Sequence, residues 1–382
     1  MRATGTATTA TTARAGAGGA GPAPGRTEPQ GNGRTETGGP PRAPGQEAAV
    51  AARARQTAEA AMAWLSAHRD GFGLGEDPLA AGTDANRTWK PLGELAQMCA
   101  VVSRLVPPGD HLHDLACDLL AHAWQQTGRG RLLHDLMRLE PFATYPLEVY
   151  AAFACGGLRH PGIEQAAATV TASRGWRMTE QQPNRRLGVA NTERRTGVRP
   201  HGTPARLLRR TWLGALPEPW TFERTAGYTL THVVFHLTDW GLRPQAVPRD
   251  VAHYLQAWLP PWLDTCVEDE QWDLTCELLA SGASLPQPLP AAFTADAWAH
   301  LTQAQDAAGA LPEVGATGRD RPPEGFGSCY HSTAMAAFAA VLTLTRTTRD
   351  QPTGRTPSGR GRGAHRSPAA GSGTAHRTGG GT

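Results

Sequence analysis

Four polar side chains interrupt an otherwise apolar stretch past the middle of the chain. They recur every three or four residues: Tyr228, His232, His236 and Asp239. This spacing places them on one face of a helix that has 3.6 residues per turn, which Gly241 is expected to end. Two imidazoles one turn apart, followed by a carboxylate, are spaced to hold a divalent metal, so His232, His236 and Asp239 are candidate metal ligands. The alternatives are ligand recognition without metal, and histidines that only bond to neighbouring helices.

A second polar stripe is expected on the helix that follows residue 268. Asp273, Cys276 and Glu277 occupy positions i, i+3 and i+4 there. Two carboxylates this close in a buried setting raise each other's pKa, which suits general acid and base catalysis. Asp273 and Glu277 are therefore candidate catalytic residues. A pair of solvated carboxylates is the alternative.

A third group of polar residues follows a glycine-rich turn and begins a helix of small residues. Cys329 and His331 stand at this helix start, where the positive end of the helix dipole favours a thiolate and lowers an imidazole pKa. Residues two apart do not share a helix face, which disfavours a Cys–His nucleophilic pair. His331 is a third candidate catalytic residue, and ordinary hydrogen-bonded polar groups are the alternative. The candidate ligand-binding residues of the chain are Tyr228, His232, His236, Asp239, Cys329 and Tyr330.

Zinc is the metal that best fits this mixture of imidazole, carboxylate and thiolate, since magnesium prefers oxygen ligands. His232 and His236 would supply two nitrogens. The residues that can complete a tetrahedral set are Asp239, Asp273, Cys276 and His331. The stretch lacks the glutamate of an H-E-x-x-H motif, so it does not predict that class of protease. Whether zinc binds at all remains open, because backbone carbonyls satisfy buried histidines easily.

These residues must be positioned by helices, because the helical period dominates residues 47–348. Apolar side chains repeat every three to four positions in about twelve segments, and none alternates with period two. The predicted fold class is all-α. The most apolar segments alternate with more polar ones, as inner and outer helices do: they are residues 91–105, 145–157, 223–240, 268–280 and 326–347. This alternation favours an α/α toroid, with a curved array of helical hairpins as the alternative.

Two segments carry more specific expectations. Residues 179–196 have helical length but are strongly polar, which predicts an exposed outer helix or an irregular crossing. Pro260 and Pro261 are expected to end the helix that begins near Pro248, since proline cannot donate the next backbone hydrogen bond.

The two ends of the chain differ from its centre in composition. Residues 1–46 and 349–382 consist largely of Ala, Gly, Thr, Pro, Ser and Arg, so they cannot bury enough apolar surface to offset the entropy of ordering. We expect two disordered tails around one domain at residues 47–348. No run of about 18 apolar residues and no apolar signal segment occurs, which predicts a cytoplasmic protein without a membrane span. The six cysteines form no C-x-x-C pair and are expected to be reduced.

Two resemblances add to these patterns. The segment Tyr330-His331-Ser-Thr resembles the Tyr-His-Thr segment of protein prenyltransferase β subunits, which implies an α/α toroid in which His331 binds zinc. That family takes its other ligands from Asp-x-Cys, and the nearest equivalent is Asp273-x-x-Cys276. Residues 50–347 more closely resemble an uncharacterised actinomycete helical domain family. The segments that carry this likeness are Tyr228-x-x-x-His232-x-x-x-His236-x-x-Asp239-x-Gly241, Trp272-Asp273-Leu274 and Cys329-Tyr330-His331.

Two function classes remain open on this basis. The first is a domain that binds a small molecule or a protein through polar residues in an apolar helical ring. The second is an enzyme of specialised metabolism, with or without zinc, that acts on a small or isoprenoid-like substrate. No G-x-G-x-x-G or P-loop motif predicts nucleotide binding, and a net charge of +3 without a basic recognition helix predicts no nucleic-acid partner.

Overall fold

The computed structural model describes residues 44–80, 82–315 and 325–349. Every regular element in these ranges is helical, which confirms the predicted all-α class. Fourteen α-helices are described, of which α7 (Arg174–Met178) and α9 (Pro204–Leu208) have only five residues each. Helix α1 (Pro44–Ala67) begins three residues inside the predicted N-terminal tail, whereas residues 1–43 and 350–382 lie outside the described ranges.

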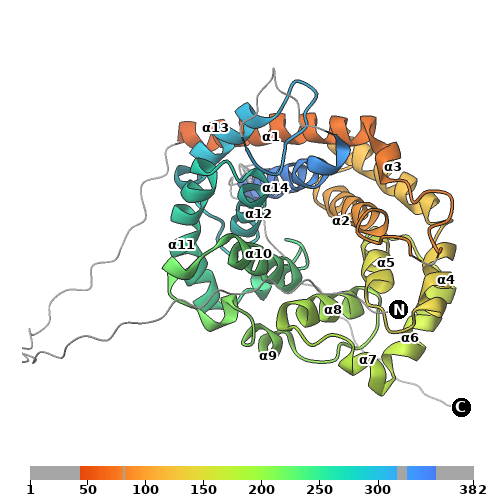
Figure 1. Cartoon of the computed structure of the whole chain (residues 1–382). Helices are drawn as coiled ribbons and strands as arrows, with labels where there is room; N and C mark the ends of the chain where they lie inside the picture. Colours follow the sequence, from red (N-terminus) through yellow and green to blue (C-terminus); the bar gives the residue numbers. More distant parts are fainter. Residues whose placement is uncertain (1–43, 81, 316–324, 350–382) are drawn as a thin grey trace, which may run out of the picture. The chain divides into compact units, whose positions relative to one another are not determined.

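Figure 1 shows an inner set of helices. They are α2 (Trp89–Leu105), α5 (Tyr145–Cys155), α8 (Pro183–Arg195), α10 (Arg224–Thr238), α12 (Trp272–Ala283) and α14 (Tyr330–Arg349). In chain order each of them packs against the next, and α14 packs against α2. The toroid stays a prediction that this succession favours over a simple curved array.

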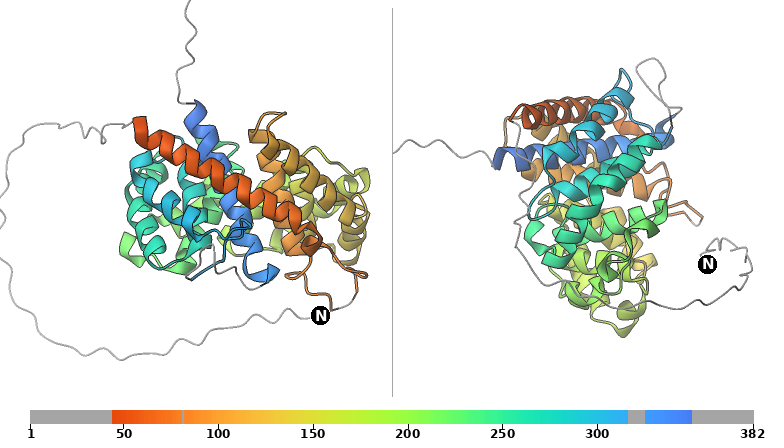
Figure 2. Two further views of the ribbon diagram at one scale, coloured as in Figure 1. Left: turned by 90° about the horizontal axis from the view of Figure 1, so that it is seen from above. Right: turned by 90° about the vertical axis from the view of Figure 1, so that its left-hand side faces the viewer.

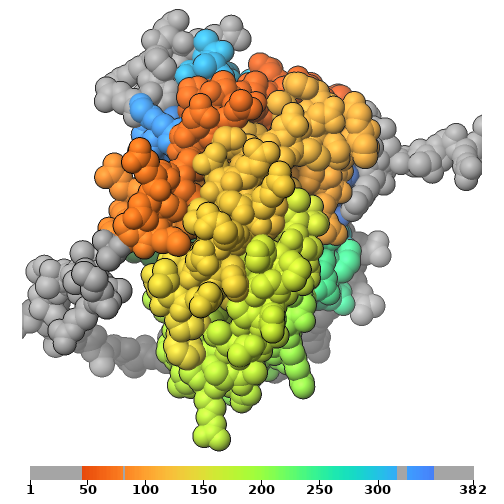
Figure 3. Space-filling model, turned by 90° about the vertical axis from the view of Figure 1, so that its right-hand side faces the viewer, coloured from red at the N-terminus to blue at the C-terminus, as the bar shows by residue number. Residues whose placement is uncertain are grey.

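The remaining helices lie outside the inner set. Beside α1, α7 and α9, they are α3 (His111–Gln126), α4 (Arg131–Leu139), α6 (Pro161–Thr171), α11 (Arg249–Glu268) and α13 (Ala295–Ala304). Figure 3 shows the outer surface that α3, α4 and α6 contribute to. On another side α1 lies across α14 and packs closely against it (Figure 2). Among the described residues, no helix is both long and apolar enough to cross a bilayer.

The inner helices are buried, so their polar side chains must find partners within the protein. Every residue of α12 from Trp272 to Ala283 is buried, including two carboxylates. Helix α14 carries a run of small residues, Ala334–Ala340 with Met335 and Phe338, that is also buried and that lets α1 and α12 approach closely. A polar group in such a helix needs a partner inside the protein, because water does not reach it.

Helix α8 corrects the prediction for residues 179–196. It is neither exposed nor irregular, since residues 186–193 are buried. Its polar side chains find partners inside the protein: the Trp176 indole donates to Glu193 Oε1 at 2.8 Å, and Arg186 Nη2 lies 3.8 Å from the same oxygen. The prediction assumed that a buried helix needs an apolar face. In α8, ion pairs and hydrogen bonds satisfy the buried polar side chains instead.

Helix α11 corrects the prediction that Pro260 and Pro261 end a helix. It continues through both prolines to Glu268. The continuation buries Trp262, Leu263 and Cys266 against the rest of the domain. Tertiary packing of these side chains outweighs the hydrogen bonds that the two prolines cannot make.

Candidate functional site

Side chains from two inner helices, α12 and α14, converge at one point. Asp273 and Glu277 project from α12, and His331 from the first turn of α14, and one ligand-type atom from each lies within 4.8 Å of the others. His331 Nε2 is 3.5 Å from Asp273 Oδ1 and 3.5 Å from Glu277 Oε1. The three candidate catalytic residues of the sequence are thus neighbours in the fold, and we call them the central triad.

Helix α10 holds the outer oxygen of each carboxylate. Tyr228 Oη donates to Asp273 Oδ2 at 2.9 Å, and the Thr231 hydroxyl donates to Glu277 Oε2. The other oxygen of each carboxylate therefore faces His331. Asp273 Oδ1 is buried and accepts no hydrogen bond from the described residues. Thr231 is a site residue that the sequence analysis missed, because a threonine within an apolar helix carries no distinctive signal.

The second nitrogen of His331 faces a third carboxylate, on helix α2. His331 Nδ1 lies 3.2 Å from Glu94 Oε2, to which Tyr330 Oη also donates at 3.0 Å. Lys90 Nζ is 3.0 Å from Glu94 Oε1. Glu94 was missed as well, since Lys90 and Glu94 at i and i+4 look like an ordinary surface pair. The available signal was its place on one of the most apolar helices of the chain.

His232 lies at the open side of the central triad. Its Nε2 is 3.7 Å from Glu277 Oε1, and its side chain is 45% exposed whereas that of Glu277 is 2% exposed. The two carboxylates of the triad are thus buried and His331 is half-buried, beside a histidine that solvent reaches.

Opposite charges in close contact shift the pKa values of this cluster. Burial opposes a charged His331, but Asp273 and Glu94 raise its pKa well above the usual value. Burial also opposes a charged Glu277, but the two histidines lower its pKa to about 2. Burial and the neighbouring Glu277 raise the pKa of Asp273 to about 6, against the effect of His331. The pKa values of two adjacent carboxylates are therefore shifted in opposite directions, an arrangement typical of acid–base sites.

His236 and Asp239 do not join this cluster. Helix α10 ends at Thr238, and Asp239 follows in the left-handed conformation with φ of 55°, so it leaves the helix face on which spacing placed it. Its carboxylate contacts Arg194 at 2.6 Å and Arg195 at 2.5 Å. The structure therefore does not assemble His232, His236 and Asp239 as one ligand set. Only His232 among the three borders the central triad.

All residues of the site lie within the part of the chain that matches one family model. Residues 58–341 match the domain of unknown function DUF6895. The chain belongs to the DUF6895 family. This confirms the coarser part of the predicted resemblance, a helical domain family whose description assigns no activity. No curated protein and no solved structure matches the chain.

The cysteines of the DUF6895 domain that the sequence analysis singled out are thiols outside the triad. Burial raises the pKa of Cys329 to about 11, and its Sγ lies 3.3 Å from the Gly325 carbonyl oxygen. This corrects the expectation of a thiolate, because burial outweighs the helix dipole. Cys276 is fully buried, which raises its pKa well above the usual value. Tyr330 belongs to the site only indirectly, through its hydrogen bond to Glu94.

Proposed function

We propose that the DUF6895 domain binds a divalent transition metal, zinc in the first place, through Asp273, Glu277 and His331. The observation that carries this proposal is the spacing of the donor atoms, since both N–O separations are 3.5 Å. That is long for a hydrogen bond. Ligands about 2.0–2.1 Å from a tetrahedral ion lie roughly 3.3–3.4 Å apart, close to the observed separations. The buried Asp273 Oδ1 without a hydrogen bond points the same way.

The surroundings of the triad also support a metal. Ligand histidines commonly direct their second nitrogen to a carboxylate, and ligand carboxylates accept hydrogen bonds on the oxygen that does not bind the ion. The second nitrogen of His331 faces the carboxylate of Glu94 in this way. Tyr228 and Thr231 donate the hydrogen bonds to Asp273 and Glu277. Without a metal, three carboxylates surround the imidazole of His331. The other positive or protonatable groups beside them are Lys90, next to Glu94, and His232, next to Glu277. A divalent cation would balance this negative charge.

Three protein ligands leave a fourth position for water or substrate, which is typical of catalytic zinc. A bound metal lowers the pKa of its water, and a nearby base can accept the proton. His232 is suitably placed for that role, beside Glu277 and open to solvent. Activation of water for attack on a small polar substrate is therefore the reaction class that we propose, which places the protein among metal-dependent enzymes.

Metal analysis of protein purified without an affinity tag tests the proposal. We expect about one zinc per chain after dialysis, and its loss in His331→Ala and in the nearly isosteric Asp273→Asn variant. His236→Gln, one turn from His232 on the same helix, is the matched control and should keep its zinc. Circular dichroism and thermal unfolding verify the fold of each variant. Wild-type protein that stays metal-free after exposure to zinc, or unchanged zinc in both ligand variants, contradicts the metal site.

The role of His232 needs a separate measurement. Hydrolysis of p-nitrophenyl acetate serves as a generic probe of an activated water. We expect zinc-dependent hydrolysis that falls in His232→Ala while the zinc content stays constant. Hydrolysis that is unaffected by His232→Ala would argue against the general-base role and would leave the metal site intact.

The pKa contrast within the carboxylate pair favours a second candidate, which needs no metal. Asp273, with a pKa of about 6, would donate a proton while Glu277 stays ionised. A domain that only binds a small molecule or a protein through these side chains is the non-catalytic form of this candidate. Folded, metal-free protein that binds or converts a ligand, with loss in Glu277→Gln, would favour it over the metal centre.

A further inference from the structure

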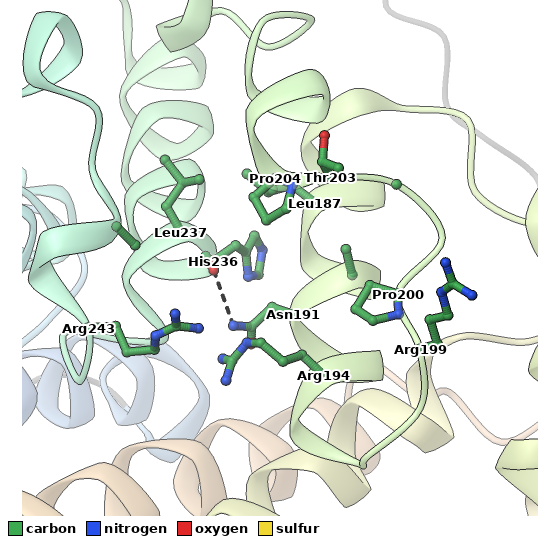
Figure 4. Close-up of a pocket in the computed structure, with 13 residues that line it drawn as sticks. Leu187, Asn191, Arg194, Arg199, Pro200, Thr203, Pro204, His236, Leu237 and Arg243 are labelled. Atoms are coloured by element: carbon green, nitrogen blue, oxygen red, sulfur yellow. Dashed lines mark hydrogen bonds between the residues drawn. The ribbon is translucent and has the colours of Figure 1, made fainter.

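A pocket of about 520 Å³ lies between α8 and α10, beside residues 199–204 and 243–246 (Figure 4). Its wall is largely apolar, with contributions from Leu187, Ala190, Pro200, Pro204, Leu237 and Ala246. Helix α10, whose Tyr228 and Thr231 contact the central triad, also lines the pocket, but no triad residue does. The volume suits a small organic molecule.

Positive charge surrounds this pocket. Arg194, Arg199 and Arg243 line it, and no Asp or Glu is among its lining residues. Figure 4 shows Arg194 and Arg243 extending toward each other beside Asn191. Within the described part of the chain, Arg199 and Arg243 form no ion pair. Two exposed guanidinium groups at one pocket therefore remain available to an anion.

The carboxylate behind the pocket does not balance this charge. Arg194 and the buried side chain of Arg195 both contact the same oxygen of Asp239. One negative charge is therefore shared between two positive charges. Asn191 Nδ2 also donates to that oxygen, at 3.2 Å. Two arginines thus already share the carboxylate of Asp239, and among the described residues it makes no ion pair with Arg243 or Arg199. The region keeps a surplus of positive charge at neutral pH.

His236 adds a neutral polar group to the pocket wall. Its imidazole rests against Gly188, where an added Cβ would lie 2.9 Å from Nε2. Burial, together with nearby His232 and arginines, lowers its pKa well below the usual value. A neutral ring can donate or accept a hydrogen bond, and it does not compete with the arginines for an anion.

We propose that this pocket binds a small organic anion, a carboxylate or phosphate monoester with an apolar body. The guanidinium groups of Arg243 and Arg199 recognise the charged end, since their planar forks match carboxylate and phosphate oxygens. The apolar wall covers the rest of the ligand. This site goes beyond the proposed metal centre and does not depend on it.

Calorimetric titration with phenyl phosphate, benzoate and inorganic phosphate tests this inference. We expect phenyl phosphate or benzoate to bind, and its affinity to fall about tenfold or more in Arg243→Ala and in Arg199→Ala. The matched control is Arg87→Ala, an exposed arginine away from the pocket, which should bind as the wild type does. Arg199 and Arg243 are both exposed, so their removal should leave the thermal unfolding temperature unchanged.

The outcomes separate the possible ligands and the two sites. Binding of phenyl phosphate alone assigns a phosphate monoester, and binding of benzoate alone assigns a carboxylate. Inorganic phosphate that binds as tightly as phenyl phosphate overturns the organic character of the ligand. No binding of either organic anion, or binding unaffected by both pocket variants, overturns the site itself. Binding should persist in His331→Ala and in chelator-treated protein, so failure of the metal proposal would not affect this result.

Discussion

Two histidines one turn apart on α10 belong to opposite electrostatic environments. His232 faces Glu277, which raises its pKa. His236 is half-buried near arginines and near His232 itself, and these surroundings lower its pKa well below the usual value. Their ring centroids are only 6.2 Å apart. Residue type and spacing are thus the same for both, and the neighbouring helices decide which one borders an anionic cluster and which a cationic pocket.

The largest expected difference between the two regions is their response to pH. Zinc must displace protons from His331 and from Asp273, whose pKa values are raised, the latter to about 6. Zinc affinity should therefore rise with pH, by up to about 100-fold per unit below pH 6, where two protons are lost. Benzoate affinity should stay nearly constant between pH 6 and 8, since His236 is already neutral. Competition titrations at several pH values measure both, and a zinc affinity independent of pH would contradict the assigned ligands.

The next effect concerns the carboxylate behind the cationic pocket. Asp239→Asn should destabilise the domain by about 3 kcal/mol, because it leaves the buried Arg195 without its ionic partner. Asparagine tolerates the left-handed backbone at this position, so the backbone should add little to the loss. Urea unfolding measures the change. The same variant should keep its zinc and bind the organic anion more tightly, because Arg194 at the pocket wall loses its anionic partner. Anion binding that is unchanged or weaker would contradict this effect of Asp239.

A smaller effect is expected where His236 rests on α8. An alanine at position 188 would place its Cβ 2.9 Å from His236 Nε2. Gly188→Ala should shift the imidazole and lower the free energy of unfolding by about 1 kcal/mol. The higher helix propensity of alanine offsets part of the cost of the clash. Thermal unfolding and titration of His236 by NMR detect both changes. An unshifted His236 resonance would mean that the pocket wall adapts without moving the ring.

The inner helices could be predicted largely from their apolar composition, and α8 shows why one could not. Composition identifies a buried helix when its side chains are apolar, but Glu193 is buried through partners on other segments. Those partners are tertiary contacts, which no local pattern reveals. The continuation of α11 through Pro260 and Pro261 has the same origin, because burial of Trp262 beyond them overrides a local rule.

The candidate site was predictable to the extent that polar residues stood out on apolar helices. Asp273, Glu277 and His331 were singled out in this way, and the structure brings them together. Asp239 was misplaced because helical spacing was extended one residue past Thr238, into a left-handed turn. Glu94 was missed because its importance arises only when α14 brings His331 beside α2.

That meeting of α2 and α14 also bears on the order of events during synthesis. Tyr330 and Glu94, which share a hydrogen bond, are 236 positions apart in the chain. Such distant contacts form late, because a long segment must be ordered before its ends can pair. The ribosome has therefore produced nearly every helix before His331 can reach the carboxylates. A nascent chain that lacks α14 would hold Glu94, Asp273 and Glu277 without their common partner, His331. An ion that binds only after His331 has joined these carboxylates would therefore mark a domain whose folding is complete.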